Sequence, residues 1–197
     1  MKRARPELEL LRRAIADKRQ APRGARATSE PTAYDPRVRW DDFAAAAPDL
    51  ALLGRERFER YELCMVGTLR RDGSPRISPC ELDFAAGELF LGMMWRSPKA
   101  LDLLRNSRCV LHSCTHDRAG TQGDFKLYGH ARDVREPQSR DAYRAAIRAR
   151  IEWDPPEPFH VFAIDVTSAG YVVFGEERLG MAWDPERGLR RWKQREQ

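Results

Sequence analysis

The stretch from Leu63 to Leu104 constrains the fold more than any other part of the chain, because turn signals divide it into short strand-like runs. Two runs, residues 62–70 and 75–84, meet at Asp72-Gly73, a pair that favours a tight hairpin because both residues tolerate a positive φ. A third run, residues 88–95, follows after a second turn. We therefore expect a β-hairpin and a third strand in direct succession.

The third run breaks into a helix start, Ser97-Pro98-Lys99. Ser97 is a good N-cap, and Pro98 suits the first helical position, where a backbone N–H has no intrahelical partner. Free backbone N–H groups, a hydroxyl and an ammonium therefore meet at one point. This combination predicts a phosphate-binding site at the start of a helix over residues 98–105.

The rest of the chain supplies further strand-like runs with helical segments between them. Further helices are expected at residues 41–47, 50–60 and 137–151, and further strands at residues 108–115, 124–135, 161–166, 171–174 and 179–183. Antiparallel-type strands with helices as separate inserts favour a closed or split barrel over a parallel α/β sheet. We therefore predict a mainly β fold in which helices flank a split antiparallel β-barrel.

In this region the chain resembles the pyridoxamine 5'-phosphate oxidase-like family, the FMN-binding split β-barrels. The resemblance rests on the hairpin D-G-S-P-R-I-S-P, the strand E-L-F-L, and S-P-K-A-L-D-L-L leading to N-S-R-C-V-L-H. It extends from about Tyr61 to Asp117, and more loosely to about Val173. The order and spacing of the motifs carry the match, since no single motif is as specific as a metal-binding cysteine framework.

The resemblance implies which residues bind the cofactor. The implied cofactor-binding residues are Arg76, Ile77, Ser78, Met93, Met94, Trp95, Ser97, Lys99 and Lys126. In the family the second strand lies against the flavin ring and ribityl chain, the end of the third strand lines the flavin, and an S-x-K element binds its phosphate. Each residue type also has a structural explanation: a solvated arginine or lysine, a core cluster of methionine and tryptophan, or a capped surface helix.

Two positions depart from the family pattern. Pyridoxamine phosphate oxidases carry a basic residue where this chain has Glu81, and another where it has Pro98. The residues that bind the substrate phosphate in those oxidases have no clear match here either. We therefore expect an FMN-dependent oxidoreductase with a different small-molecule substrate, and we assign no catalytic residue. A deazaflavin-dependent reductase of the same fold and a non-enzymatic flavin- or haem-binding carrier or sensor remain as alternatives.

The charge distribution separates an N-terminal extension from the rest of the chain. Residues 1–30 hold nine of the 35 Lys and Arg residues and four of the 30 Asp and Glu residues, which leaves 26 of each sign elsewhere. The net charge of +5 therefore belongs to a solvated arm, and we expect no nucleic-acid binding. The expected organisation is a basic, flexible extension over residues 1–36 with a weak helix at 6–18, a helical lead-in over 37–60, the barrel over 61–185 and a tail over 186–197.

Metal binding and membrane insertion are not expected. Cys109, His112, Cys114 and His116 look like metal ligands, but on a strand Cys109 points to the side opposite the other three. No apolar run approaches the roughly 20 residues that a membrane-spanning helix needs, and no apolar signal-peptide core follows the N-terminal basic residues. We expect a cytoplasmic protein with reduced cysteines, and the resemblance implies a homodimer with the cofactor at its interface.

Overall fold

The computed structural model describes residues 37–175 and 177–195, so the helix expected at residues 6–18 lies outside the described part. The elements in chain order are α2 (Trp40–Ala46), α3 (Pro48–Glu59), β1 (Leu63–Leu69), β2 (Pro75–Ala85), β3 (Glu88–Met94), α4 (Pro98–Arg105), β4 (Arg108–Ser113), β5 (Asp124–Asp133), α5 (Pro137–Ile151), β6 (Phe159–Val173), β7 (Glu177–Asp184) and β8 (Gly188–Arg195).

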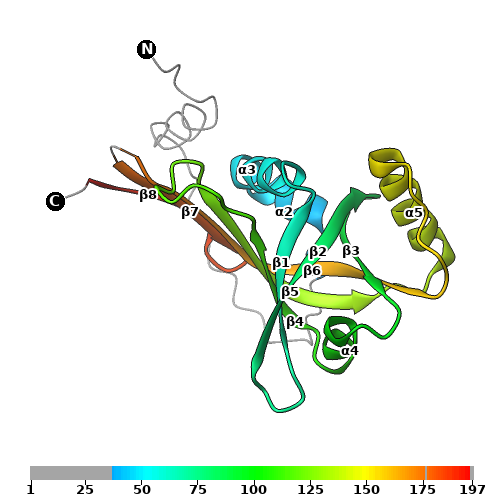
Figure 1. The fold of residues 1–197 in the computed structure, drawn as a ribbon. Helices are drawn as coiled ribbons and strands as arrows, with labels where there is room; N and C mark the ends of the chain where they lie inside the picture. The colour runs from blue at the N-terminus through cyan, green and yellow to red at the C-terminus, as the bar shows by residue number, and fades with distance from the viewer. Residues whose placement is uncertain (1–36, 176, 196–197) are drawn as a thin grey trace, which may run out of the picture.

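The strands form one antiparallel sheet in the order β3-β2-β1-β4-β5-β6-β7-β8, and an additional pairing of β3 with β6 closes the first six strands into a barrel. The prediction of a mainly β split barrel with flanking helices is confirmed. β7 and β8 continue the sheet beyond the barrel as a long hairpin that projects away from it (Figure 1). The stretch expected as a tail over residues 186–197 thus contains a strand.

The hairpin at Asp72-Gly73 forms as expected, and only Gly73 of the pair takes a positive φ, of 83°. The Asp72 carboxylate accepts hydrogen bonds from the backbone N–H and hydroxyl of Ser74. This local bonding fixes the turn, and the turn fixes the β1–β2 register that pairs Leu69 with Pro75.

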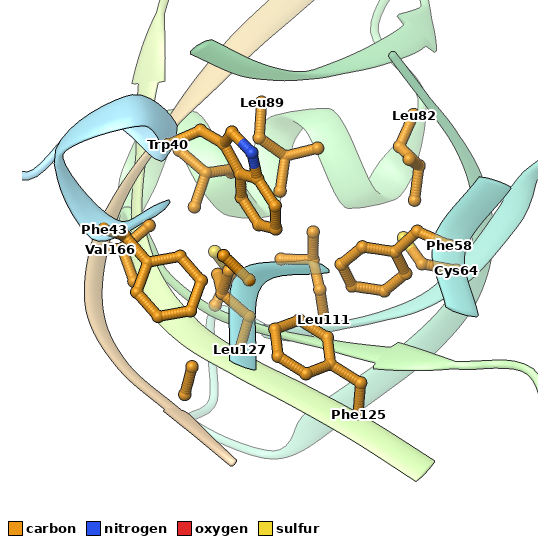
Figure 2. Packing of buried hydrophobic residues seen from close by; sticks show 14 of the residues in the cluster. Trp40, Phe43, Phe58, Cys64, Leu82, Leu89, Leu111, Phe125, Leu127 and Val166 are labelled. Atoms are coloured by element: carbon orange, nitrogen blue, oxygen red, sulfur yellow. The ribbon is translucent and has the colours of Figure 1, made fainter. Parts of the chain in front are cut away.

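The main core fills the barrel, and α2 and α3 cover it. Trp40 and Phe43 of α2 and Phe58 of α3 pack among buried side chains of the strands, including Leu111 and Phe125 (Figure 2). The Phe58 and Phe125 rings meet edge to face, with centroids 5.3 Å apart. The helical lead-in is therefore part of the core rather than an appendage to it.

The first two helices start slightly earlier than expected. The N-cap residue of α2 is Arg39. The Asp42 carboxylate accepts a hydrogen bond of 3.0 Å from the backbone N–H of Arg39, so it acts from inside the first turn. In α3 the residue at the first helical position is Pro48, which suits that position because it has no N–H to satisfy.

The helix α5 covers the outer side of β2 and β3 and forms a second, smaller core. Its buried Tyr143 and Ile147 pack with Phe90 and Phe159. A Cβ at Gly92 of β3 would overlap the Tyr143 hydroxyl, so only glycine allows this close approach of helix and strand. This outer layer positions the candidate functional site.

Candidate functional site

A cavity of about 590 Å³ lies between β2, β3, the first turn of α4 and the segment that follows α5. Cys80 and Leu82 of β2 are buried in the barrel core, so Glu81 between them projects outward into this cavity. The opposite wall consists of Trp153, the prolines that follow it, and Phe159. Most of the lining is apolar, with Glu81 and Lys99 as its charged groups.

The structure brings four of the sequence-predicted residues together in this cavity: Met93, Met94, Trp95 and Lys99. Met93 is 4% exposed, whereas Met94 is 78% and Trp95 52% exposed. Register explains the difference, because Met94 pairs with Phe159 on the outer face while Met93 points into the core. Met94 and Trp95 therefore offer apolar surface to a ligand.

The first turn of α4 carries the predicted phosphate-binding groups. The Lys99 ammonium donates a hydrogen bond of 2.6 Å to the carbonyl oxygen of Pro79, which joins α4 to β2. Ser97 is the N-cap residue and its carbonyl oxygen accepts a bond from the N–H of Leu101. The Ser97 hydroxyl makes no cap bond. It is buried without a hydrogen-bond partner among the described residues, next to the positive end of the helix dipole.

Arg76 lies outside this cavity. Its guanidinium donates a hydrogen bond of 2.6 Å to the buried Asp102 carboxylate, which also accepts bonds from Thr68 and Arg105. Desolvation raises the pKa of Asp102, but these hydrogen bonds outweigh it and hold the pKa below its ordinary value. Arg76 thus stabilises a buried carboxylate and lines a separate open groove beside Arg70.

The other predicted residues also lie away from the cavity. Ile77 is 70% exposed, and Ser78 is half-buried opposite Val66 of β1. Lys126 of β5 binds the Asp124 carboxylate at 2.9 Å. Within one chain, β1 and β4 lie between β5, which carries Lys126, and β2, which lines the cavity.

A cation of α5 that the sequence did not indicate binds Glu81 of the cavity lining. The guanidinium of Arg150 donates hydrogen bonds to the buried Asp83 at 2.8 Å and to Glu81 at 3.2 Å. The bonds to Asp83 raise the pKa of Arg150, while burial raises the pKa of Asp83. Glu81, which replaces a basic residue of the family pattern, is therefore partly neutralised by an arginine 69 positions later in the chain.

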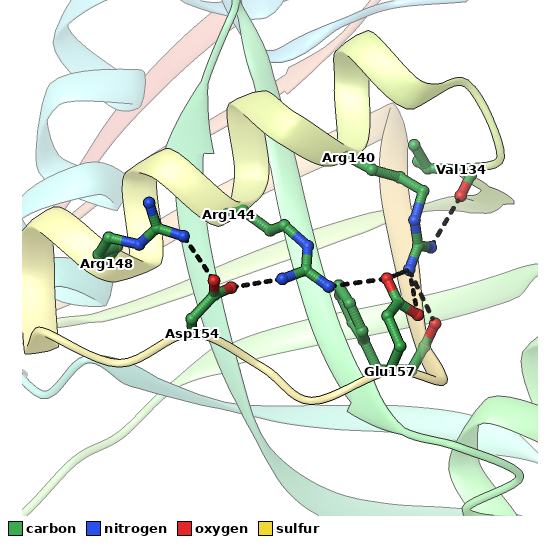
Figure 3. Close-up of polar contacts among 7 residues, drawn as sticks. Val134, Arg140, Arg144, Arg148, Asp154 and Glu157 are labelled. Atoms are coloured by element: carbon green, nitrogen blue, oxygen red, sulfur yellow. Dashed lines mark hydrogen bonds and ion pairs between the residues drawn. The ribbon is translucent and has the colours of Figure 1, made fainter.

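A ladder of ion pairs holds the opposite wall in place (Figure 3). Arg144 bridges Asp154 and Glu157, while Arg148 adds a second bond to Asp154 and Arg140 a second bond to Glu157. These hydrogen bonds to arginine lower the pKa of both carboxylates. The guanidiniums of Arg140 and Arg144 also lie 4.3 and 4.9 Å from the centre of the Phe159 ring. The arginines that form the ion pairs therefore also contact the ring that lines the cavity.

The cysteines and histidines of the β4 region form no metal site within the described residues. Burial raises the pKa of Cys109 to about 12 and that of Cys80 to about 11, so both thiols stay protonated. The strand β4 ends at Ser113, and the ring of His116 packs against Tyr61 instead of continuing the strand pattern. In the described part of the chain, no helix is long and apolar enough to cross a membrane.

A closed antiparallel barrel with helices outside it, and a ligand-sized cavity beside a helix N-terminus, defines the class of split β-barrel proteins. The family model described as pyridoxamine 5'-phosphate oxidase matches residues 54–173, more than half of the chain. The chain belongs to the pyridoxamine 5'-phosphate oxidase family. No curated protein matches the sequence.

Solved structures share this fold at low sequence identity. A pyridoxamine 5'-phosphate oxidase-related, FMN-binding protein of Nostoc punctiforme is 13% identical with a TM-score of 0.52, covering 75% of this chain and 95% of its own. The haem storage protein HutZ of Vibrio cholerae is 15% identical with a TM-score of 0.52, covering 66% and 95%. A protein of Clostridium acetobutylicum related to general stress protein 26 is 15% identical with a TM-score of 0.50, covering 68% and 94%.

Proposed function

We propose that the chain binds FMN in the cavity of about 590 Å³ and is an oxidoreductase that acts on a small molecule other than pyridoxine phosphate. The observation that carries this proposal is one arrangement at the start of α4. A mostly apolar cavity of ligand size is lined by Lys99 in the first turn of α4, and the buried hydroxyl of the N-cap residue Ser97, without a partner among the described residues, lies two positions earlier and outside the lining. FMN has a planar aromatic ring system at one end and a phosphate at the other.

The residues present fit this cofactor. Met94, Trp95 and Phe159 provide apolar surface for the ring system, and Ser97 and Lys99 provide a hydroxyl donor and a cation for the phosphate. The Glu81 carboxylate opposes a phosphate, but Arg150 offsets its charge. A site with this few cations depends strongly on each of them.

When bound, FMN supplies the electron-transfer chemistry, and the protein supplies binding, orientation and a dry environment. Lys99 fixes the phosphate end relative to β2 through its bond to the Pro79 carbonyl oxygen. Trp153 and Phe159 cover the cavity from the α5 side and reduce its contact with water.

The absorbance spectrum of protein purified from its expression host tests this proposal. We expect the two visible bands of an oxidised flavin, and reconstitution of the apoprotein with FMN to restore them. A deazaflavin spectrum or the Soret band of haem would replace the FMN assignment with one of the two alternatives. A protein that takes up none of the three would contradict a cofactor-binding role.

We also infer a homodimer. Register places Ile77, Val110 and Tyr128 in one row across the outer face of β2, β1, β4 and β5, with Gly67 between Ile77 and Val110. Ile77 is 70% and Tyr128 48% exposed, and the row lies on the same face as the cavity wall. Apolar side chains gathered on one strand face favour an interface between two copies.

Light scattering of the purified protein at micromolar concentration tests the dimer. Ile77→Asp should convert the dimer to a monomer. Leu52→Asp is the matched control, because Leu52 on α3 is also exposed, at 45%, and lies outside this row. A monomeric wild-type protein would exclude the dimer, and dissociation by both variants would exclude this face as the interface.

A further inference from the structure

A second cavity, of about 440 Å³, adjoins the first. The two share Trp95, Pro158 and Phe159 as wall residues. The remaining walls of the second cavity include Leu104 of α4 and His160 of β6, neither of which lines the first cavity. Trp95 therefore stands between two neighbouring chambers.

His160 is the unusual residue of the second cavity. Its side chain is 7% exposed and lies between two aromatic rings, with Trp95 at 4.5 Å and an interplanar angle of 14°, and Phe162 at 5.9 Å and 23°. Its Nε2 atom is buried and has no hydrogen-bond partner among the described residues. Buried polar atoms in native proteins are almost always paired, so this nitrogen indicates a partner that the chain itself does not provide.

The charges around the second cavity are already neutralised by one another. Arg140 pairs with Glu157 at 3.0 Å, and Arg135 pairs with Asp133 at 2.7 Å. Desolvation lowers the pKa of His160, which keeps the imidazole neutral at neutral pH. The chamber thus offers aromatic surface and one neutral hydrogen-bonding nitrogen, and each charged side chain of its described lining has a partner of opposite charge.

We propose that the second cavity binds an uncharged, planar ring compound through a hydrogen bond to Nε2 of His160 and through packing against Trp95. In the structure Nε2 is buried, so binding requires a neighbouring side chain to move. Trp95, which stacks on the imidazole, is already 52% exposed. In one respect the inference rests on the proposed function: if the first cavity holds FMN, the second is the chamber for the ring of its substrate.

Nuclear magnetic resonance on protein labelled with ¹⁵N-histidine tests the binding directly, because the chain has only four histidines. The probes are nicotinamide and nicotinate, which have rings of the same size and differ in charge. Nicotinamide should shift the ring signals of one histidine saturably, and nicotinate should bind at least tenfold more weakly. His160→Gln identifies that signal.

An obstruction variant keeps the test independent of changes at His160. Leu104→Trp adds bulk to the wall of the second cavity and should weaken nicotinamide at least tenfold. Leu101→Trp is the matched control: Leu101 is 40% exposed, Leu104 is 44% exposed, both lie on α4, and Leu101 lines neither of the two cavities. Equal loss in both variants, equal binding of both probes, or an unshifted His160 signal would overturn the proposal.

Measuring the same titration with and without FMN separates this inference from the cofactor assignment. Nicotinamide bound at His160 in a protein that takes up no FMN would support the second site and remove the first proposal. FMN bound without any response of His160 to nicotinamide would remove the second site and leave the cofactor proposal intact.

Discussion

The two walls of the first cavity are built in different ways. One wall comes from residues 79–99, together with Leu63 of β1. In this continuous stretch, turns, strand register and a helix cap determine the structure. The other wall, α5 and the segment up to Phe159, packs on the barrel through Tyr143 and Ile147 and is joined to β2 by the ion pair between Arg150 and Asp83. Ion pairs such as Arg144–Glu157 hold the segment to the helix. The proposed phosphate site thus belongs to the locally determined wall, and the cover over the ring site belongs to the wall that long-range contacts attach.

The largest expected effect comes from breaking the buried attachment of α5. Arg150→Ala leaves the Asp83 side chain, which is 4% exposed, without its cation. Removing one partner of a buried ion pair destabilises a protein by about 3–5 kcal/mol, because the remaining charge stays buried. We expect a loss of that size in the free energy of unfolding, measured by urea denaturation.

The exposed part of the same attachment provides the control. The Arg148 side chain is 60% exposed and pairs with Asp154 at the surface. Exposed ion pairs contribute about 0–1 kcal/mol, so Arg148→Ala should change stability by no more than that. If both variants lowered the free energy of unfolding by the same amount, burial would not explain how much each ion pair of α5 contributes to stability.

The sequence predicted the first wall well because local rules determine it. The helices at residues 98–105 and 137–151 have the predicted bounds, since each starts with a proline at its first position and carries clear periodicity. For the second wall, the sequence predicted the helix α5 but not the contacts that attach it. Arg150 and Asp83 are 67 positions apart, and neither segment carries a signal that identifies its partner.

The strand β6 shows a different limit. Two strands were expected at residues 161–166 and 171–174, but one strand runs from Phe159 to Val173. The small and polar residues between the expected strands resemble a turn, yet they pair with β5 on one side and partly with β7 on the other. Tertiary pairing overrides local propensity here. The stacking of His160 on Trp95 depends on the same long-range pairing, so the sequence did not single out His160.

A second, smaller effect concerns the locally determined wall. Lys99→Ala removes the cation of the proposed phosphate site, and a charge-assisted hydrogen bond of about 1.5–3 kcal/mol corresponds to roughly a ten- to hundredfold loss of FMN affinity. Fluorescence titration of the apoprotein with FMN measures it. Lys193→Ala is the control, because Lys193 lies on β8 outside the cavity and should leave the affinity unchanged. Unchanged affinity in Lys99→Ala would place the phosphate elsewhere.

The smallest expected effect is a pH dependence of the free energy of unfolding. It arises at the boundary between the two walls, where Trp95 stacks on His160. Desolvation lowers the folded-state pKa of His160 below its ordinary value of 6.5, although Asp133 opposes the shift. Between these two pKa values the unfolded chain binds more protons, so the free energy of unfolding falls as the pH drops from neutral through about 6.5.

The carboxylates of the α5 ladder do not obscure this effect. The pKa values of Asp154 and Glu157 are lowered, so the stability they contribute declines only at more acidic pH. Urea denaturation of wild type and His160→Gln between about pH 7 and pH 5.5 isolates the histidine. The wild type should lose stability relative to the variant over this range. A constant difference would mean that His160 titrates alike in the folded and unfolded states, and that Trp95 does not keep its imidazole neutral.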